Sequence, residues 1–368
     1  MINRSHVIKM KPTKAQEAGL TNAVGIVRYV YNWGIDTWEH LYKSSQSRSY
    51  NILSRMWTVV KPEWSSGVSD SAHRRALRDV ESAFNRHIKG SSGKPGYRKR
   101  RIHDSFYIGG DRTKIIGKKI RIPKIGVIRL TEELRFKNAK IESYTIKRKA
   151  DGWYLIVKCL IPDSRSWSDI GPVGVDVGCT PWATSSDNEI LLEPDNVKYL
   201  RRRLAKAQHD MSRKSRGSSN RAKAVDRVGR LYQRIDNIKK DATHKYTHAI
   251  AKNHRIVCVE GIDVSSLRSS KLPGVRKGVH NGMLGEIIRQ LKYKSHTIVE
   301  VDRFYPSTQL CSSCGSRNTH MRLQDRVYNC TSCGISTDRD LNAAINILNE
   351  GLICITVGHT GSACGDSK

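Results

Sequence analysis

The chain has 368 residues, of which 65 are Lys or Arg and 34 are Asp or Glu, so its net charge is +31. A positive excess of this size attracts polyanions, which makes nucleic acid the expected partner. The 38% hydrophobic content is enough to bury cores, and the length predicts two or three domains. Because it contains no apolar run of about 18 residues and no leader with an apolar core, we expect a cytoplasmic protein without a membrane partner.

The first hundred residues are expected to contain one strand and two helices. Residues 5–11 are typical of a strand, and residues 13–43 have apolar side chains at helical spacing. A second helix is predicted over residues 69–87, and the serine-rich segment between the helices is predicted to be a loop.

A basic cluster follows the second predicted helix. Such clusters are usually solvated surface, but the net charge of this chain favours a nucleic-acid contact. The candidate contact residues are Arg98, Lys99, Arg100 and Arg101.

Residues 105–161 change to a period of two, which predicts an antiparallel sheet or a small barrel. Asp151-Gly152 lies between two alternating runs and is a hairpin-turn signal. Residues 162–172 are expected to link this region to a second domain.

The second domain is predicted to begin with a short apolar strand that ends in Asp176. A second strand and a turn at Asp187-Asn188 follow, which is typical of a ribonuclease H-like sheet. Two polar helices are then predicted between residues 198 and 240, where fifteen Lys or Arg stand against three acids. This imbalance favours a surface that follows phosphates over an ordinary solvated hairpin, and the candidate contacts are Arg201, Arg202 and Arg203.

A later apolar strand, residues 256–260, ends in Glu260. A carboxylate at the end of a buried strand must be paired, protonated or bound to a cation. The Gly-, Ser- and Lys-rich residues 265–278 are expected to form a loop, followed by a helix over 283–293 and a strand over 297–301.

Two Cys-x-x-Cys pairs, Cys311 with Cys314 and Cys330 with Cys333, have the separation of a zinc ribbon. Two disulfides or a chance arrangement are the alternatives. The other five cysteines are scattered, as expected for reduced thiols in a cytoplasm: Cys159, Cys179, Cys258, Cys354 and Cys364. We therefore predict one tetrahedral Zn²⁺, which is structural because a closed four-cysteine site has no open position for a substrate.

Three acids, Asp176, Glu260 and Asp340, lie on separate predicted elements that a mixed α/β sheet can bring together. Taken singly, each is equally well explained as a helix cap or an ion-pair partner. Taken together, they are the hard oxygen ligands that two Mg²⁺ or Mn²⁺ ions require for phosphodiester hydrolysis. Asp338 is predicted to cap and orient the final helix.

These motifs resemble those of the TnpB (OrfB) proteins of insertion sequences, relatives of type V CRISPR effector nucleases. Residues 174–178 with 183–187 look like the first RuvC motif, residues 257–260 like the second, and residues 338–348 like the third, in which Asp340 takes the catalytic position. Residues 305–309 and the four cysteines are similar to the family's pre-ribbon segment and ribbon. Two departures are visible, Gly261 in place of a common acid and the unusual continuation Thr180-Pro-Trp, and neither removes one of the three carboxylates.

The resemblance implies an RNA-guided DNA endonuclease encoded by a transposable element, which cuts beside a short flanking motif in a RuvC site. It implies Asp176, Glu260 and Asp340 as catalytic magnesium ligands, a structural zinc, and a transposon-derived guide RNA with double-stranded target DNA as partners. The implied location is the prokaryotic cytoplasm, at the nucleoid when DNA is bound. A guide-dependent repressor that does not cleave and an accessory transposition protein remain as alternatives.

The implied fold class is multidomain α+β. A wedge-like antiparallel β-barrel, residues 1–11 and 104–165, is expected to hold an inserted helical recognition lobe at residues 12–103. A RuvC domain with a ribonuclease H-like α/β fold is expected at residues 170–308 and 336–352, interrupted by a zinc ribbon at 309–335. Residues 353–368 are expected to be a C-terminal tail.

Overall fold

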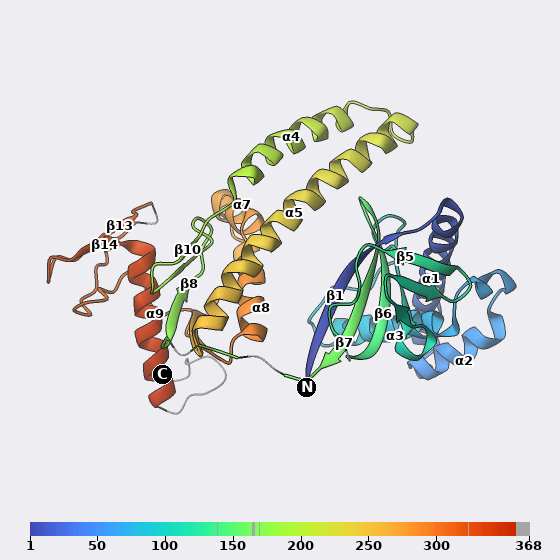
Figure 1. Ribbon diagram of the computed structural model, residues 1–368, viewed down its shortest axis with the longest axis horizontal. Helices are drawn as coiled ribbons and strands as arrows, with labels where there is room; N and C mark the ends of the chain where they lie inside the picture. The colour runs from blue at the N-terminus through green and yellow to red at the C-terminus, as the bar shows by residue number, and fades with distance from the viewer. Residues whose placement is uncertain (138, 164–165, 169, 323, 358–368) are drawn as a thin grey trace. The chain divides into compact units, whose positions relative to one another are not determined.

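The computed structural model describes residues 1–137, 139–163, 166–168, 170–322 and 324–357 (Figure 1). Contacts within the chain define two units, residues 1–164 and residues 165–368. Among the helices of the described residues, none combines the length and apolarity needed to cross a membrane. The expected linker at residues 162–172 lies partly outside the described residues.

Unit 1 contains a curled antiparallel sheet in which the long first strand is central. This strand pairs with β7 on one side and β5 on the other. The order is β2-β6-β7-β1-β5-β4-β3, so β2 and β3 are edges, and the expected barrel is an open half-barrel. The strands are β1 (Ile2–Lys11), β2 (Ser105–Gly109), β3 (Ile115–Ile116), β4 (Lys119–Ile122), β5 (Gly126–Leu130), β6 (Lys140–Lys149) and β7 (Gly152–Ile161).

The predicted hairpin between β6 and β7 is confirmed. Lys149 pairs with Gly152 across the turn, and Gly152 has a φ of +136°, which a side chain would strain. The Asp151 carboxylate accepts hydrogen bonds from Lys9 and from the Tyr154 hydroxyl. The turn is therefore tied to the neighbouring strand as well as to its own.

Three helices pack with this sheet around one hydrophobic core. They are α1 (Lys14–Lys43), α2 (Tyr50–Val60) and α3 (Asp70–Ile88), with short 3₁₀ turns at η1 (Glu63–Gly67) and η2 (Gly110–Arg112). The first and third agree with the predicted helices. Thr13 caps α1 through a reciprocal pair of hydrogen bonds with Gln16.

The predicted loop between α1 and α3 is wrong, because α2 lies there. Ser49 caps α2 by accepting a hydrogen bond from the Ile52 amide. Leu53 and Trp57, four residues apart, are buried on one face of this helix. The serines that dominate residues 44–49 precede the helix, and they masked the short apolar stripe that follows them.

Unit 2 is built on a mixed five-stranded sheet with the order β10-β9-β8-β11-β12. Strands β8, β11 and β12 are parallel, and β9 and β10 are antiparallel additions at one edge. The strands are β8 (Val173–Asp176), β9 (Ala183–Ser185), β10 (Ile190–Leu191), β11 (Ile256–Glu260) and β12 (Thr297–Val301). This agrees with the strands predicted for residues 173–192, 256–260 and 297–301.

The predicted helical hairpin is confirmed as α4 (Asp195–Ser212) and α5 (Ser219–Asn253), which lie side by side in Figure 1. A further helix, α8 (Leu284–Lys294), also agrees with its prediction. The predicted loop over residues 265–278 is wrong: α6 (Val264–Arg268) and α7 (Pro273–Asn281) lie there. The Asp263 carboxylate caps α6 and Pro273 is the first residue of α7, so local capping chemistry outweighs the loop-like composition.

The C-terminal region contains a two-stranded ribbon and the last helix. Strands β13 (Val327–Asn329) and β14 (Ser336–Asp338) pair antiparallel, and α9 (Arg339–Thr356) starts directly after β14. This helix continues past residue 352, where the C-terminal tail was expected to begin. Residues 358–368 of that tail lie outside the described residues.

Candidate functional site

Strand alternation places two of the three candidate carboxylates on the same face of the unit 2 sheet. Val173 and Val175 of β8, together with Val257 and Val259 of β11, join the core formed with α5 and α8. The intervening residues therefore point to the opposite face, which α9 covers. Gly174 pairs with Cys258, and the strands end two residues further on at Asp176 and Glu260, on the same face.

The third carboxylate, Asp340, belongs to α9, which packs in close contact with this face of the sheet. A Cβ atom on Gly174 would lie 2.1 Å from the Ala344 carbonyl oxygen, and one on Gly351 would lie 2.4 Å from the Cys258 sulfur. Both strand and helix backbones need glycine at these contacts, since any side chain would force them apart. The close approach places Asp340, in the first turn of α9, beside the ends of β8 and β11.

Asp338 and two arginines hold Asp340 in place. The Asp338 carboxylate accepts hydrogen bonds from the amides of Asp340 and Leu341, which confirms the predicted helix cap. Arg339 donates to Asp340 Oδ1 at 2.8 Å, and Arg326, which precedes β13, lies 3.3 Å from Oδ2. The buried Asp340 carboxylate is thus compensated by cations from α9 and from the ribbon.

The three carboxylates interact electrostatically. Burial, then the charges of Asp340 and Glu260, raise the pKa of Asp176 to about 7. Burial likewise raises the pKa of Glu260. A divalent cation would relieve this concentration of negative charge, and carboxylate oxygens suit Mg²⁺ or Mn²⁺. The donor set therefore fits such an ion, although within the described residues only the four cysteines bring three or more candidate ligand atoms within 4.8 Å of one another.

The raised pKa of Asp176 predicts a pH-dependent stability. In the unfolded chain this carboxyl ionises near 3.8, whereas in the folded, metal-free protein it stays protonated up to about pH 7. Stability should therefore fall as pH rises from about 4 to about 7, because the unfolded chain loses the proton first. Asp176→Asn should remove this penalty and raise the melting temperature of the metal-free protein above pH 7.

The largest gain is roughly 4 kcal/mol, since one pKa unit corresponds to about 1.4 kcal/mol. Partial access of solvent to Asp176 lowers that figure. Thermal melting of wild type and Asp176→Asn below pH 4 and above pH 7 measures the effect, with the exposed Asp195→Asn as control. Equal melting temperatures for the two proteins above pH 7 would contradict the raised pKa.

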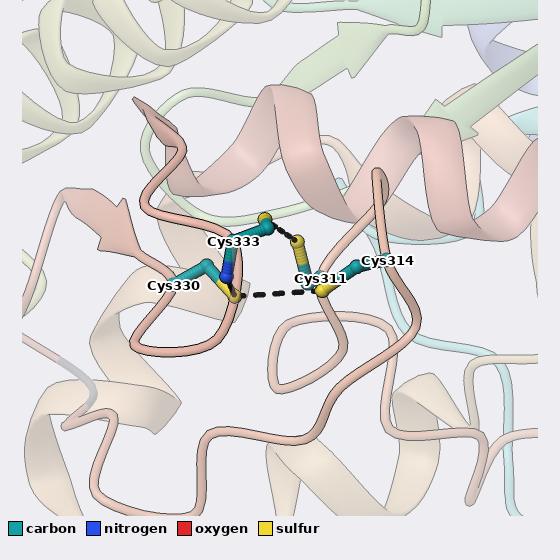
Figure 2. Close-up of side chains that lie close together, drawn as sticks. All are labelled: Cys311, Cys314, Cys330 and Cys333. Carbon is teal, nitrogen blue, oxygen red and sulfur yellow. Dashed lines mark hydrogen bonds between the residues drawn. The ribbon is translucent and has the colours of Figure 1, made fainter.

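The four predicted zinc ligands converge in unit 2 (Figure 2). The sulfurs of Cys311 and Cys333 are 3.6 Å apart, as are those of Cys314 and Cys330. A tetrahedral zinc with bonds of about 2.3 Å separates its sulfurs by about 3.8 Å, so this geometry fits the ion. A disulfide needs about 2.05 Å, so these contacts are not disulfides.

The protein environment favours the thiolate form of Cys330, whereas hydrogen bonding with the neighbouring sulfurs raises the pKa of Cys333 to about 12. Hydrogen bonds from the Ser316 hydroxyl and from the Cys333 amide lower the pKa of Cys330 to about 5. Metal binding by cysteine needs deprotonated sulfur, so this prepares one ligand in advance. The remaining described cysteines, Cys159, Cys179, Cys258 and Cys354, lie outside the cluster.

Two buried asparagines on α9, Asn342 and Asn346, were missed by the sequence analysis. Their side chains bond the backbone of the segment that leads into the ribbon, residues 307–312. The available signal was two asparagines four residues apart within the otherwise small and apolar run of residues 341–348. Such a pair lies on one helix face and needs polar partners when it is buried.

The structure separates the candidate nucleic-acid residues into exposed and internally paired groups. Arg98 pairs with Asp79 and lies over the Tyr31 ring, whereas Lys99, Arg100 and Arg101 are exposed. In unit 2, Arg201 pairs with Glu193 at 2.7 Å, and Arg202 and Arg203 are exposed on α4. The internally paired arginines, Arg98 and Arg201, therefore have a structural role whatever else they contact.

Three family models match this chain. Residues 164–271 match a family described as "Probable transposase", OrfB of the IS605 type. Residues 285–347 match the "Cas12f1-like, TNB domain", and residues 1–47 match a "Helix-turn-helix domain" of the OrfB type. In the structure that last segment is β1 followed by the single continuous helix α1.

Relatives cover nearly the whole chain. A protein of Streptomyces pristinaespiralis named "Putative RNA-guided DNA endonuclease" is 30% identical over 384 residues, which cover 99% of this chain and 92% of that protein. "Putative RNA-guided DNA endonuclease InsQ" of Escherichia coli is 26% identical, covering 97% of this chain and 93% of that protein. A Cas12f1 structure, solved with guide RNA and target DNA, superposes with a TM-score of 0.56 at 14% identity, covering 91% and 83% of the two chains.

These comparisons define the class as OrfB-type transposase-family proteins with a Cas12-like fold. The chain belongs to the TnpB (OrfB) family of IS605-type insertion sequences and is related to Cas12f.

Proposed function

We propose that this protein is an RNA-guided DNA endonuclease that hydrolyses phosphodiester bonds in a RuvC-type site formed by Asp176, Glu260 and Asp340. The observation that carries the proposal is the electrostatic interaction of Asp176 with Glu260 and Asp340, where the carboxyl ends of β8 and β11 face the first turn of α9. Membership of a family whose relatives bear the name of RNA-guided DNA endonucleases supports it.

The three carboxylates would hold two Mg²⁺ or Mn²⁺ ions. When bound, such ions supply an activated water and neutralise the charge on the leaving oxygen. The protein's own contribution is to place three oxygen donors on two strands and one helix of the same unit. Asp176 must give up its proton for that role, so the site should bind cations more weakly below about pH 7.

The proposed function also assigns a role to each domain. The half-barrel of β1 to β7 would be the wedge domain, residues 1–11 and 104–165, and α1 to α3 would be the recognition lobe within residues 12–103. The mixed sheet with its helices would be the RuvC domain, residues 170–308 and 336–352, with the zinc ribbon at 309–335 inserted before α9. The guide would be a transposon-derived RNA, and base pairing with it would select the target DNA.

A single assay tests this function. The protein is purified with its bound RNA, that RNA is sequenced, and cleavage is measured on targets with randomised flanking sequence. Metal-dependent cutting beside one short motif is the expected result. Guide-dependent binding without cutting would indicate a repressor, and neither binding nor cutting would favour an accessory role in transposition.

The exposed arginines of α4 predict a change in salt dependence. Arg202→Ala with Arg203→Ala should weaken nucleic-acid binding and lower the log–log salt slope by about 1–2, since each lost phosphate contact is worth roughly 0.7–0.9. The flanking motif should stay the same, because phosphate contacts carry no base information. Filter binding across a salt series measures the slope.

Lys245→Ala is the matched control for this experiment. It removes one exposed cation of α5 whose charge is already balanced by Asp241. An unchanged slope and affinity in the double variant would show that this face of α4 is only solvated. A changed flanking motif would instead place it at the target DNA.

A further inference from the structure

Two asparagine side chains of α9, the helix that carries Asp340, connect this helix to the zinc ribbon. Asn342 is fully buried, and its Oδ1 accepts a hydrogen bond from the Ser312 amide at 2.9 Å. Its Nδ2 donates to the Leu310 carbonyl at 2.7 Å. Asn346, 4% exposed, donates to the carbonyls of Ser307 and Leu310, each at 2.8 Å.

The positions of these contacts join the two candidate metal sites. Ser312 follows the zinc ligand Cys311 directly, inside the first cysteine knuckle. Asn342 follows Asp340 by two residues, which is about 200° around a helix. The first turn of α9 is therefore held between the sheet, on the side of Asp340, and the cysteine knuckle, on the side of Asn342.

A second link connects the ribbon to the same turn. The Arg339 amide donates to the Arg326 carbonyl at 2.9 Å, and the Arg326 side chain reaches Asp340. Arg326 precedes β13, the strand that leads to the second cysteine pair. Both links thus depend on a ribbon with little core of its own, namely Tyr328 and two of the cysteines with a few partly buried neighbours.

We propose that Asn342 is a positioning residue that couples zinc occupancy of the ribbon to the placement of Asp340, and so to the affinity of the three-carboxylate centre for a divalent cation. The inference rests on the proposed nuclease function. Small ribbons depend on their metal for folding, so zinc loss should release Ser312 and Leu310 from Asn342. The buried amide would then lack partners, and the first turn of α9 would rearrange to solvate it.

The test compares full-length Asn342→Ala with wild type and with Asn349→Ala, an exposed asparagine on the same helix. Zinc content should stay at one per chain in all three. The affinity for Mn²⁺, measured by electron paramagnetic resonance, should fall about tenfold or more in Asn342→Ala alone, as observed when residues that support metal ligands are removed. Saturating Mn²⁺ should largely restore its cleavage rate, because the defect lies in cation affinity.

Removing zinc from wild type by chelation and dialysis provides the second arm. It should weaken Mn²⁺ binding at least as much as Asn342→Ala does and speed hydrogen exchange at the amides of Asp340 and Leu341, which the Asp338 cap protects. In Asn342→Ala the same treatment should have a smaller further effect than in wild type, because the Asn342 connection is already broken and only the Arg326 link is left to lose. This arm needs no variant, so it tests the coupling even if Asn342→Ala fails to fold.

The outcomes separate this inference from the proposed function. Wild-type Mn²⁺ affinity in Asn342→Ala, or no effect of zinc removal on exchange at Asp340, would overturn the coupling. If Asp340→Ala still weakens Mn²⁺ binding in that case, the nuclease proposal stands. Mn²⁺ binding that is indifferent to Asp340→Ala would overturn both.

Discussion

Asp176→Ala, Glu260→Ala and Asp340→Ala should each abolish DNA cleavage while leaving guide and target binding nearly intact. In the proposed function the three carboxylates share one site, so any single loss should cost at least about 10³-fold in rate, and double variants should be little worse. Cleavage of guided targets under single-turnover conditions measures the rate, and gel-shift experiments measure binding.

Two control variants test whether the loss of cleavage is specific to these three carboxylates. Asp195→Ala removes an exposed carboxylate of the same unit and should cleave as wild type does. Asp338→Ala should be milder than Asp340→Ala, since it removes a helix cap worth about 1 kcal/mol and no proposed ligand. Near-wild-type cutting by any of the three principal variants would remove that residue from the active site.

Elemental analysis of the folded protein should find one zinc per chain, bound by Cys311, Cys314, Cys330 and Cys333. Cys311→Ser or Cys330→Ser should lose the metal, because a closed site needs all four ligands. Zinc contributes roughly 10 kcal/mol or more to the folding of small zinc-dependent domains, so the ribbon should unfold locally in these variants. Proteolysis of residues 309–335 should become rapid, and cleavage of DNA should be lost with it.

Cysteines outside the cluster supply the controls. Cys354→Ser and Cys364→Ser should change neither zinc content nor cleavage, although Cys354 is a buried residue of α9 and its replacement will cost some stability. Cys364 lies outside the described residues. Active, folded protein without zinc would refute the assignment.

Several features of this protein follow from its sequence alone. The spacing of the two cysteine pairs predicted the cluster, and the period-two pattern predicted the β6–β7 hairpin. The apolar runs before Asp176 and Glu260 predicted two strands that end at these residues. Each signal is local, because strand alternation and the spacing of metal ligands can both be recognised within a short stretch of the sequence.

Other features were decided by tertiary structure. Composition suggested loops where α2, α6 and α7 lie. Helices form there instead, because buried partners and capping residues outweigh the local serines and glycines. By charge alone Arg98 and Arg201 resembled their exposed neighbours, but in the structure Asp79 of α3 pairs with Arg98, and Glu193, just before α4, pairs with Arg201. The raised pKa of Asp176 and the link from Asn342 to Ser312 likewise depend on residues distant in sequence, since burial and partner choice exist only once the chain has folded.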